Sequence, residues 1–205
     1  TIQDAVNASN AGDTIIVRDG TYIENVAVNK SITIESENGS AAVAVTAASS
    51  IVPVFDVNAD GITIEGFAVS GPTDTHVAGI ELVDASSCTI VNNDCSGCYN
   101  GIHLGGAAAG NNVTRNYCHD NTRRGISLRD TATGNFVSEN TCENNAGDEI
   151  CIKDETHDNT IWLNNFMGSV ECLTDNTYHS PAQLTYTYNG SIYTNYLGNY
   201  YSGYT

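Results

Sequence analysis

The chain has few basic residues. Among its 205 residues, seven Lys and Arg face 24 Asp and Glu, which gives a net charge of −17 at pH 7. Nucleic acids and anionic lipids are bound largely through Lys and Arg, so this balance argues against either as a partner. No apolar run is long enough to span a bilayer. The charge fits a solvated, self-repelling surface or one that binds cations.

Helical patterns are also scarce. Residues 2–10 carry Ile2, Ala5, Val6 and Ser9 at helical spacing, and Gly12 ends this segment. No helical pattern follows, and no break in composition marks a second domain. We expect one domain over 1–205: an N-terminal cap at 1–12, strands wound over 13–175, and a C-terminal cap at 176–205.

What the chain has is a repeat of about 24 residues. Three apolar registers keep it: Ile80, Ile102, Ile126 and Ile150 (with Leu82, Leu104, Leu128 and Ile152); Ile64, Ile90, Val113, Val137 and Ile161; and Val69, Cys95, Cys118, Cys142 and Phe166. This period predicts a coil of short β-strands with equivalent residues stacked about 4.8 Å apart. Asn recurs at the corners (Asn93, Asn116, Asn140, Asn165), where it tolerates left-handed backbone and can bond stacked turns.

The C-terminal segment differs from the repeat. Two alternating runs flank Asn189-Gly190, which predicts a hairpin with a type I′ turn over 184–196. Eight of the 11 tyrosines lie after residue 177. We expect them to close the end of the coil. The alternative is a platform on which sugars stack, because Tyr joins a flat apolar face to a polar tip.

Cysteines and sequons favour an extracellular, cell-surface location. Seven cysteines in an acidic, Asn-rich chain fit an oxidising compartment. Five Asn-x-Ser/Thr sequons are candidate glycosylation sites: Asn7, Asn29, Asn38, Asn112 and Asn189. The chain starts at Thr1 without Met or a signal sequence, so we expect a processed product or an excised piece.

Several cysteines are placed to form disulfides. Cys95, Cys118 and Cys142 follow an inward register, so each is expected to be buried, and neighbours could bond as Cys118–Cys142 or Cys95–Cys118. Because seven is odd, at least one thiol stays free or bonds to another chain.

Two further disulfides depend on how the coils align. Cys151 and Cys172 would both point outward if Leu173 continues the ladder of Ile152. Cys88 takes a corner position that holds Asn in the next coils, and it could reach Cys98 or a neighbouring molecule.

The opening segment TIQDAVNASNAGDTIIVRDGTY resembles the first coil of right-handed parallel β-helix proteins of the pectate-lyase-like superfamily. The later coils resemble the repeats of the NosD and carbohydrate-binding/sugar-hydrolase group, and the tail TYTYNGSIYTNYLGNYYSGY is similar to surface proteins of methanogens. The resemblance implies an all-β fold: a single-stranded right-handed parallel β-helix with an N-terminal helix and a Tyr-rich hairpin cap. Members of the group include lyases, hydrolases, a copper-site maturation protein and surface proteins, so the fold leaves function open.

One outward face could carry chemistry. Its positions hold Glu81, His103, Ser127 and Cys151, then Arg129 and Lys153, with Asp84, Asp130 and Asp154 beside them. A polysaccharide lyase would use Arg129 or Lys153 as base, with Ca²⁺ held by the aspartates. A hydrolase would pair Glu81 with Asp84, or Asp130 with Asp154. A solvated face with weak ion pairs is the simpler interpretation.

No metal site is predicted. His103 and His119 fall in one coil, but their spacing matches no zinc or copper pattern. The Cys95-Ser96-Gly97-Cys98 motif crosses a coil corner without a His partner. No cofactor is expected, and Ca²⁺ stays a candidate ligand.

These observations rank three functions. The first is a non-catalytic structural module of an archaeal envelope, in an S-layer, a sheath or a larger surface protein, whose partners are copies of itself or other envelope proteins. The second is a polysaccharide lyase, hydrolase or binding module that uses the face from Glu81 to Lys153. The third is a metal-handling accessory protein of the NosD type.

Overall fold

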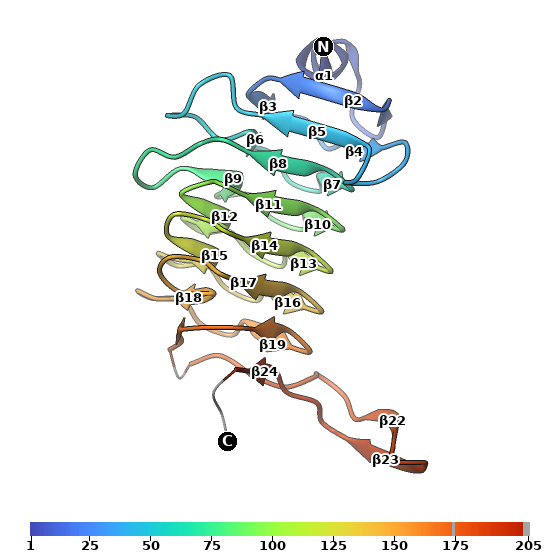
Figure 1. The fold of residues 1–205 in the computed structure, drawn as a ribbon. Coiled ribbons are helices and arrows are strands. Elements are labelled where there is room, and N and C mark those ends of the chain that lie inside the picture. The colour runs from blue at the N-terminus through green and yellow to red at the C-terminus, as the bar shows by residue number, and fades with distance from the viewer. Residues whose placement is uncertain (174, 203–205) are drawn as a thin grey trace.

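In the computed structural model, which describes residues 1–173 and 175–202, the chain winds into a parallel β-helix with α1 at one end (Figure 1). Three parallel sheets form its walls. Sheet A contains β1 (Thr14–Val17), β4 (Thr33–Ser36), β7 (Thr63–Glu65), β10 (Thr89–Val91), β13 (Asn112–Thr114), β16 (Phe136–Ser138) and β19 (Thr160–Trp162).

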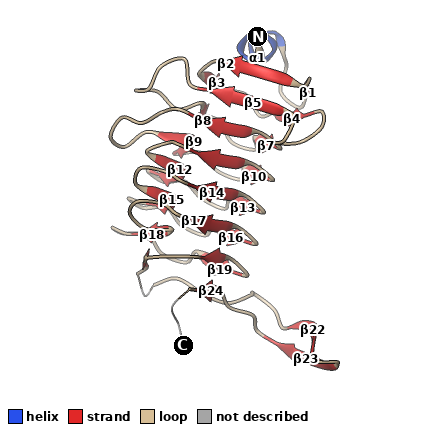
Figure 2. Ribbon diagram, viewed as in Figure 1, coloured by secondary structure: helices blue, strands red, loops and turns tan. Residues whose placement is uncertain are grey.

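Sheets B and C complete each coil, and Figure 2 shows the strands stacked above one another. Sheet B contains β2 (Gly20–Ile23), β5 (Val43–Thr46), β8 (Ala68–Ser70), β11 (Asp94–Ser96), β14 (Tyr117–His119), β17 (Thr141–Glu143), β20 (Asn165–Phe166) and β24 (Tyr200–Tyr201). Sheet C contains β3 (Val26–Val28), β6 (Phe55–Val57), β9 (Ala78–Val83), β12 (Asn100–Gly105), β15 (Arg124–Leu128), β18 (Ile150–Ile152) and β21 (Val170–Glu171). The predicted fold class is confirmed.

The apolar residues that recur along the sequence pair with one another between neighbouring strands of these sheets. Ile102 pairs with Ile80 and Ile126, Val113 with Ile90 and Val137, and Cys118 with Cys95 and Cys142. All these side chains are fully buried in one core that runs the length of the coil. In most strands of the three sheets, every second residue contributes to that core, because side chains alternate across a strand.

The N-terminal end is closed by α1 (Ile2–Ala8). Ile2 and Val6 bury against the core, and Thr1 caps the helix by accepting a hydrogen bond from the Asp4 N–H at 3.0 Å. At the other end of the helix, Lys30 donates from Nζ to the carbonyl oxygens of Val6, Asn7 and Ser9 at 2.8–2.9 Å. The helix covers the open end of the core as predicted, although it is shorter than the predicted 2–10 segment. No helix in the described part of the chain is long and apolar enough to cross a membrane.

Three ladders of asparagines, all buried except the half-buried Asn176 and Asn199, occupy the corners. They comprise Asn93, Asn116, Asn140, Asn164 and Asn199; Asn111, Asn135, Asn159 and Asn176; and Asn121 and Asn145. In each ladder the side-chain oxygen accepts from the Asn one coil earlier. The predicted bonding of stacked turns is therefore confirmed.

Two details of the Asn prediction were wrong. The fourth member is Asn164, because Asn165 lies in β20 and is exposed. The left-handed backbone also belongs to the residue before the ladder Asn, for example Glu139 (φ 58°) and Leu163 (φ 55°), at every ladder position except Asn176 and Asn199. The ladder Asn itself uses its amide to bind the neighbouring coils.

The C-terminal segment both closes the coil and extends beyond it. Tyr178 and Tyr201 pack against the core, and the ring centroids of Phe166 and Tyr201 lie 5.7 Å apart. Antiparallel strands β22 (Leu184–Tyr188) and β23 (Ser191–Asn195) then project away from the coil (Figure 1). Asn189 (φ 48°) and Gly190 (φ 76°) both have positive φ, as a type I′ turn requires. The predicted hairpin is confirmed.

Candidate functional site

The predicted face contains a groove of about 260 Å³ on sheet C, over β9, β12 and β15. Eight residues line it: His76, Glu81, Asn100, His103, Arg124, Ser127, Arg129 and Asp130. The in-register pairs of Glu81 with His103 and of His103 with Ser127 place one outward side chain from each coil in this groove. Four of the six predicted site residues thus meet here: Glu81, His103, Arg129 and Asp130.

Unpartnered polar atoms are concentrated in this groove. Five buried side-chain atoms of the described residues have no hydrogen-bond partner, and four of them belong to groove residues: Asn100 Oδ1, His103 Nδ1, Arg124 Nε and Ser127 Oγ. The fifth, Thr156 Oγ1, lies outside the groove lining. Buried polar groups normally have partners, so four such groups in one hollow indicate a place built to bind polar atoms.

Asn100, Arg124 and Ser127 were not among the predicted site residues. Asn100 and Arg124 pair in register at the start of β12 and β15. They are 4% and 6% exposed, and Ser127 is fully buried. Ser127 and Cys151 lie in register with His103, as predicted for these outward positions, and both are buried. The sequence did contain one signal for them: an amide (Asn100) and a guanidinium (Arg124) occupy positions in strands that are otherwise largely buried.

The two central titratable groups are both held near neutrality. Desolvation, together with the charge of Asp56, raises the pKa of Glu81 to about 7. Desolvation lowers the pKa of His103 to about 4, against the opposing effect of Asp130. At neutral pH, His103 is therefore uncharged and Glu81 is partly protonated, so both side chains can donate as well as accept hydrogen bonds.

Arg129, Lys153 and Asp154 are engaged in ion pairs. Arg129 Nε lies 2.6 Å from Asp154 Oδ2, and Lys153 Nζ lies 2.7 Å from Glu171 Oε1. The bond to Asp154 raises the pKa of Arg129 further, so Arg129 is a poor general base. Lys153 and Asp154 lie outside the groove lining.

The carboxylates of the predicted pairs, Glu81 with Asp84 and Asp130 with Asp154, do not face each other as a catalytic pair would. Asp84 Oδ1 accepts from the Ala107 N–H at 2.8 Å, and Asp130 Oδ2 accepts from the Gly106 N–H at 2.8 Å. These aspartates cap turns of neighbouring coils instead of facing a common ion, so they offer no gathered Ca²⁺ site. The in-register carboxylate neighbour of Glu81 is Asp56 of β6.

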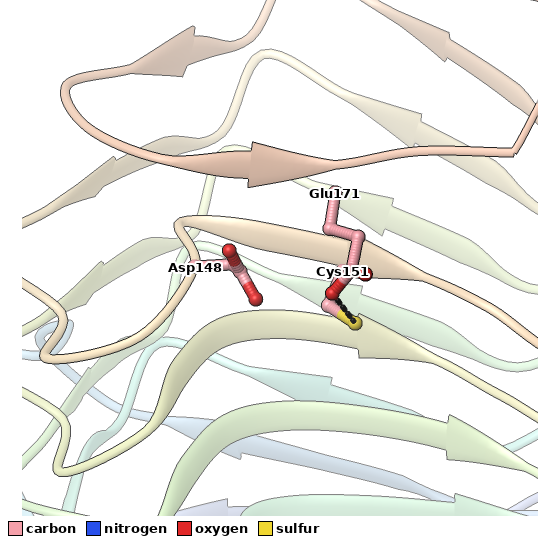
Figure 3. Close-up of side chains that lie close together, drawn as sticks. All are labelled: Asp148, Cys151 and Glu171. Carbon is pink, nitrogen blue, oxygen red and sulfur yellow. Dashed lines mark hydrogen bonds between the residues drawn. The ribbon is translucent and has the colours of Figure 1, made fainter.

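Among the residues that the structure describes, one group of side chains lies close enough together to hold a metal ion. Asp148, Cys151 and Glu171 each offer a ligand atom within 4.8 Å of the others (Figure 3). Cys151 Sγ donates to Glu171 Oε2 at 3.8 Å. Arg124 Nε lies 3.9 Å from Asp148 Oδ2, and Lys153 is paired with Glu171. Both carboxylates therefore already have cationic neighbours.

All seven cysteines are free thiols in the structure, and only Cys172 is exposed. Cys88 and Cys98 are buried and cap two of the Asn ladders, since their N–H groups donate to the side chains of Asn111 and Asn121. The register assumed for Cys172 was wrong: Cys151 pairs with Glu171, and Leu173 does not continue the ladder of Ile152.

The fold and groove define this protein as a parallel β-helix with a polar groove on one sheet. Its sequence matches the NosD family model, described as periplasmic copper-binding protein, over residues 6–205, so the chain belongs to the NosD family. It is also 39% identical over 94 residues to a cell surface glycoprotein of Methanothermus fervidus. That match covers 45% of this chain and 15% of the glycoprotein. The family description names a periplasmic protein and the relative is a cell surface glycoprotein, and this chain is extracellular.

Two solved structures share the fold. The alginate lyase from Paenibacillus sp. str. FPU-7 aligns with a TM-score of 0.64 at 18% identity, over 82% of this chain and 63% of that enzyme. The catalytic unit of a GH87 α-1,3-glucanase from Streptomyces thermodiastaticus strain HF3-3 aligns with a TM-score of 0.61 at 21% identity, over 78% and 32%. At these identities the likeness concerns the fold alone.

The residues of this chain do not fit a copper site of the kind that the family description implies. Copper favours thiolate, thioether and imidazole ligands. Among the described residues, the one clustered group contains a single thiol, and burial raises the pKa of Cys151 and so disfavours its thiolate. Cys95, Cys118 and Cys142 stack one per coil along the axis and do not surround a point.

Proposed function

We propose that this chain is a non-catalytic structural module of an archaeal cell envelope, as a component of an S-layer or sheath or as a spacer in a larger surface protein. The observation that carries the proposal is the unbroken core with Asn ladders along its axis. A rod built in this way is stiff, because each coil is bonded to the next through backbone and side chains. The similarity to part of a longer surface glycoprotein supports the spacer role.

Native-state hydrogen exchange and activity assays test this proposal together. Backbone amides of the ladder asparagines should exchange only through global unfolding, as in a rigid rod. Incubation with acidic polysaccharides should give neither new C=C absorbance nor new reducing ends. Turnover that is lost in Arg129→Ala or Lys153→Ala would overturn the non-catalytic assignment.

Disulfide stabilisation belongs to the same proposal. Cys118 lies in register between Cys95 and Cys142, so it could bond to either neighbour but not to both. In protein isolated from an oxidising compartment, we expect five titratable thiols after unfolding without reductant. A count of seven would contradict a bridge, and a dimer on non-reducing electrophoresis would indicate a bond between chains.

A second function, saccharide binding in the groove, is favoured by the four unpartnered polar atoms there. Saccharides present many hydroxyls, each of which can donate and accept. A groove with a neutral imidazole, an amide, a hydroxyl and a guanidinium, whose charge lies 3.9 Å from Asp148, offers such a ligand both donors and acceptors. Groove binding would attach a rod to envelope polysaccharide without cleaving it.

Calorimetric titration with alginate and α-1,3-glucan oligosaccharides tests saccharide binding. Asn100→Ala and Ser127→Ala should each weaken binding by about tenfold, since one hydrogen bond to a buried group contributes about 1–1.5 kcal/mol. Thr156→Val is the matched control, because it removes the one unpartnered hydroxyl outside the groove among the described residues. Binding that is insensitive to both groove variants would contradict this site.

A further inference from the structure

The C-terminal hairpin is chemically unlike the rest of the chain. No Asp, Glu, Lys or Arg follows Asp175, although the chain as a whole carries a net charge of −17. Strands β22 and β23 form a two-stranded sheet of their own, so neither outer edge of the hairpin pairs with another strand of the described chain. An isolated two-stranded hairpin is marginally stable in water, which makes a covered state more favourable than the exposed one.

One face of this hairpin is aromatic. Tyr186 and Tyr193 lie opposite each other with ring centroids 5.6 Å apart, and Leu184 and Tyr188 share their side of β22. We call these four residues the Tyr face. Tyr188 is 63% exposed, so this face is open to a partner. The opposite face carries Thr185, Thr187 and Thr194, together with Ile192, which pairs with Thr187 and is 74% exposed.

The opposite end of the molecule contains a hollow of matching character. It has a volume of about 250 Å³ and is lined by the apolar residues Ile2, Ala5, Ile15, Ile16 and Val17 together with Thr1, Arg18 and Tyr22. We call it the N-terminal groove. Ile16 is 59% exposed, and the lining contains Arg18 but no acidic residue. Strands β1 and β2 are the first strands of sheets A and B, so within the described residues each has an outer edge without a strand partner.

We propose that the Tyr face of one copy docks in the N-terminal groove of a second copy. The hairpin and α1 lie at opposite ends of the molecule (Figure 1), so they meet only between copies. Copies that each carry −17 repel one another, and the hairpin, which carries no acidic residue, is a surface through which a copy approaches with little repulsion. Arg18 adds a cation that can lie against a Tyr ring.

This contact is heterologous, because the two surfaces differ. Each docked copy still offers a free hairpin at one end and a free groove at the other, so association continues into an open chain of copies. Unpaired edges on the hairpin and on β1 allow backbone hydrogen bonds to join the two sheets. The inference rests on the proposed structural role. A rod can nevertheless serve as a spacer without self-association, so failure of one does not entail failure of the other.

Sedimentation analysis of four variants tests the contact. The unmodified chain should form concentration-dependent oligomers at up to about 1 mM. Tyr188→Lys and Ile16→Lys should each be monomeric. Thr187→Lys, on the opposite face of the same strand, and Ile23→Lys, an exposed Ile outside the groove lining, should associate like the unmodified chain.

Mixing the two monomeric variants identifies the geometry. Tyr188→Lys retains an intact groove and Ile16→Lys retains an intact hairpin, so an equimolar mixture should form a 1:1 dimer that grows no further. A mixture that stays monomeric would overturn the head-to-tail contact, as would association that survives in either variant. An unmodified chain that stays monomeric would also overturn it and would assign the Tyr face to another protein or to a following segment of a longer polypeptide.

Discussion

Asn164 accepts two hydrogen bonds from Asn140 through a single side-chain oxygen, one from the backbone N–H and one from the side-chain amide, both at 2.9 Å. The Asn164 amide in turn donates to the carbonyl oxygen of Val137 at 2.9 Å. One buried side chain thereby satisfies three polar groups of the preceding coil. The same arrangement repeats along each corner, so the ladders set the spacing of the coils as well as their register.

Asn164→Ala should therefore strongly lower the free energy of unfolding. Three buried groups lose their partners, at about 1–3 kcal/mol each, and we expect a loss of about 3–5 kcal/mol in denaturant unfolding. Asn165→Ala is the adjacent control. Its side chain is exposed, and the change should stay within about 0.5 kcal/mol. Equal effects of the two substitutions would contradict the role of the ladder.

Gly134, which precedes the ladder residue Asn135, tests the left-handed corner. Its φ is +62°, and an added Cβ would meet no atom closer than 4.0 Å, so backbone conformation is the main cost of a side chain there. Gly134→Ala should destabilise the fold by about 1 kcal/mol, whereas Gly134→Asn should cost less because Asn tolerates this region. Thermal unfolding of the two variants checks the order. Equal destabilisation by Gly134→Ala and Gly134→Asn would indicate that steric contact of the side chain, and not the backbone conformation, causes the loss.

The fold was predictable from the sequence because each ladder position recurs at a nearly constant spacing. Ile102 and Ile126 are both apolar, one period apart and flanked by less apolar residues, so their stacking followed from the period alone. The prediction was wrong where the period changes or a residue is duplicated. The coil after Cys151 is shorter than those before it, which moved Glu171 into the position expected for Cys172. Asn164 and Asn165 are identical in type, and only the register distinguishes them.

The candidate site was predictable only in part. An outward register identified Glu81 and His103, because alternation along a strand follows directly from the sequence. The burial of Arg124 and Asn100 was not predictable, because it depends on how the corners of neighbouring coils cover the groove. A charged residue at a position where the strand is otherwise buried, such as Arg124, indicates a local exception to the apolar pattern. The sequence does not show whether its charge is met by an ion pair, by a ligand or by solvent.

Glu81 should make stability depend on pH. Its pKa rises from 4.5 in the unfolded chain to about 7 in the folded one, so its contribution is fully present below pH 4.5 and is lost as the pH rises through 7. Glu81→Gln removes this loss. We expect the variant to exceed the parent by about 1–2 kcal/mol at pH 8, a value reduced for solvent access, and to match it near pH 4.

Denaturant unfolding at a series of pH values checks the Glu81 prediction. Glu155→Gln, at an exposed position, provides the control and should run parallel to the parent at every pH. A Glu81→Gln variant that also runs parallel to the parent would mean that Glu81 ionises normally in the folded state.

Ser127→Ala should change stability and ligand binding in opposite directions. The Ser127 hydroxyl is buried without a partner, so its removal should raise the free energy of unfolding by about 1 kcal/mol when no ligand is bound. The same substitution should weaken any saccharide that uses this hydroxyl. Thr156→Val should also stabilise the free protein but leave saccharide binding unchanged. Parallel thermal unfolding and calorimetry of the two variants separate a hydroxyl kept for a ligand from one that is merely tolerated, and a Ser127→Ala variant less stable than the parent would show that the hydroxyl is satisfied within the fold.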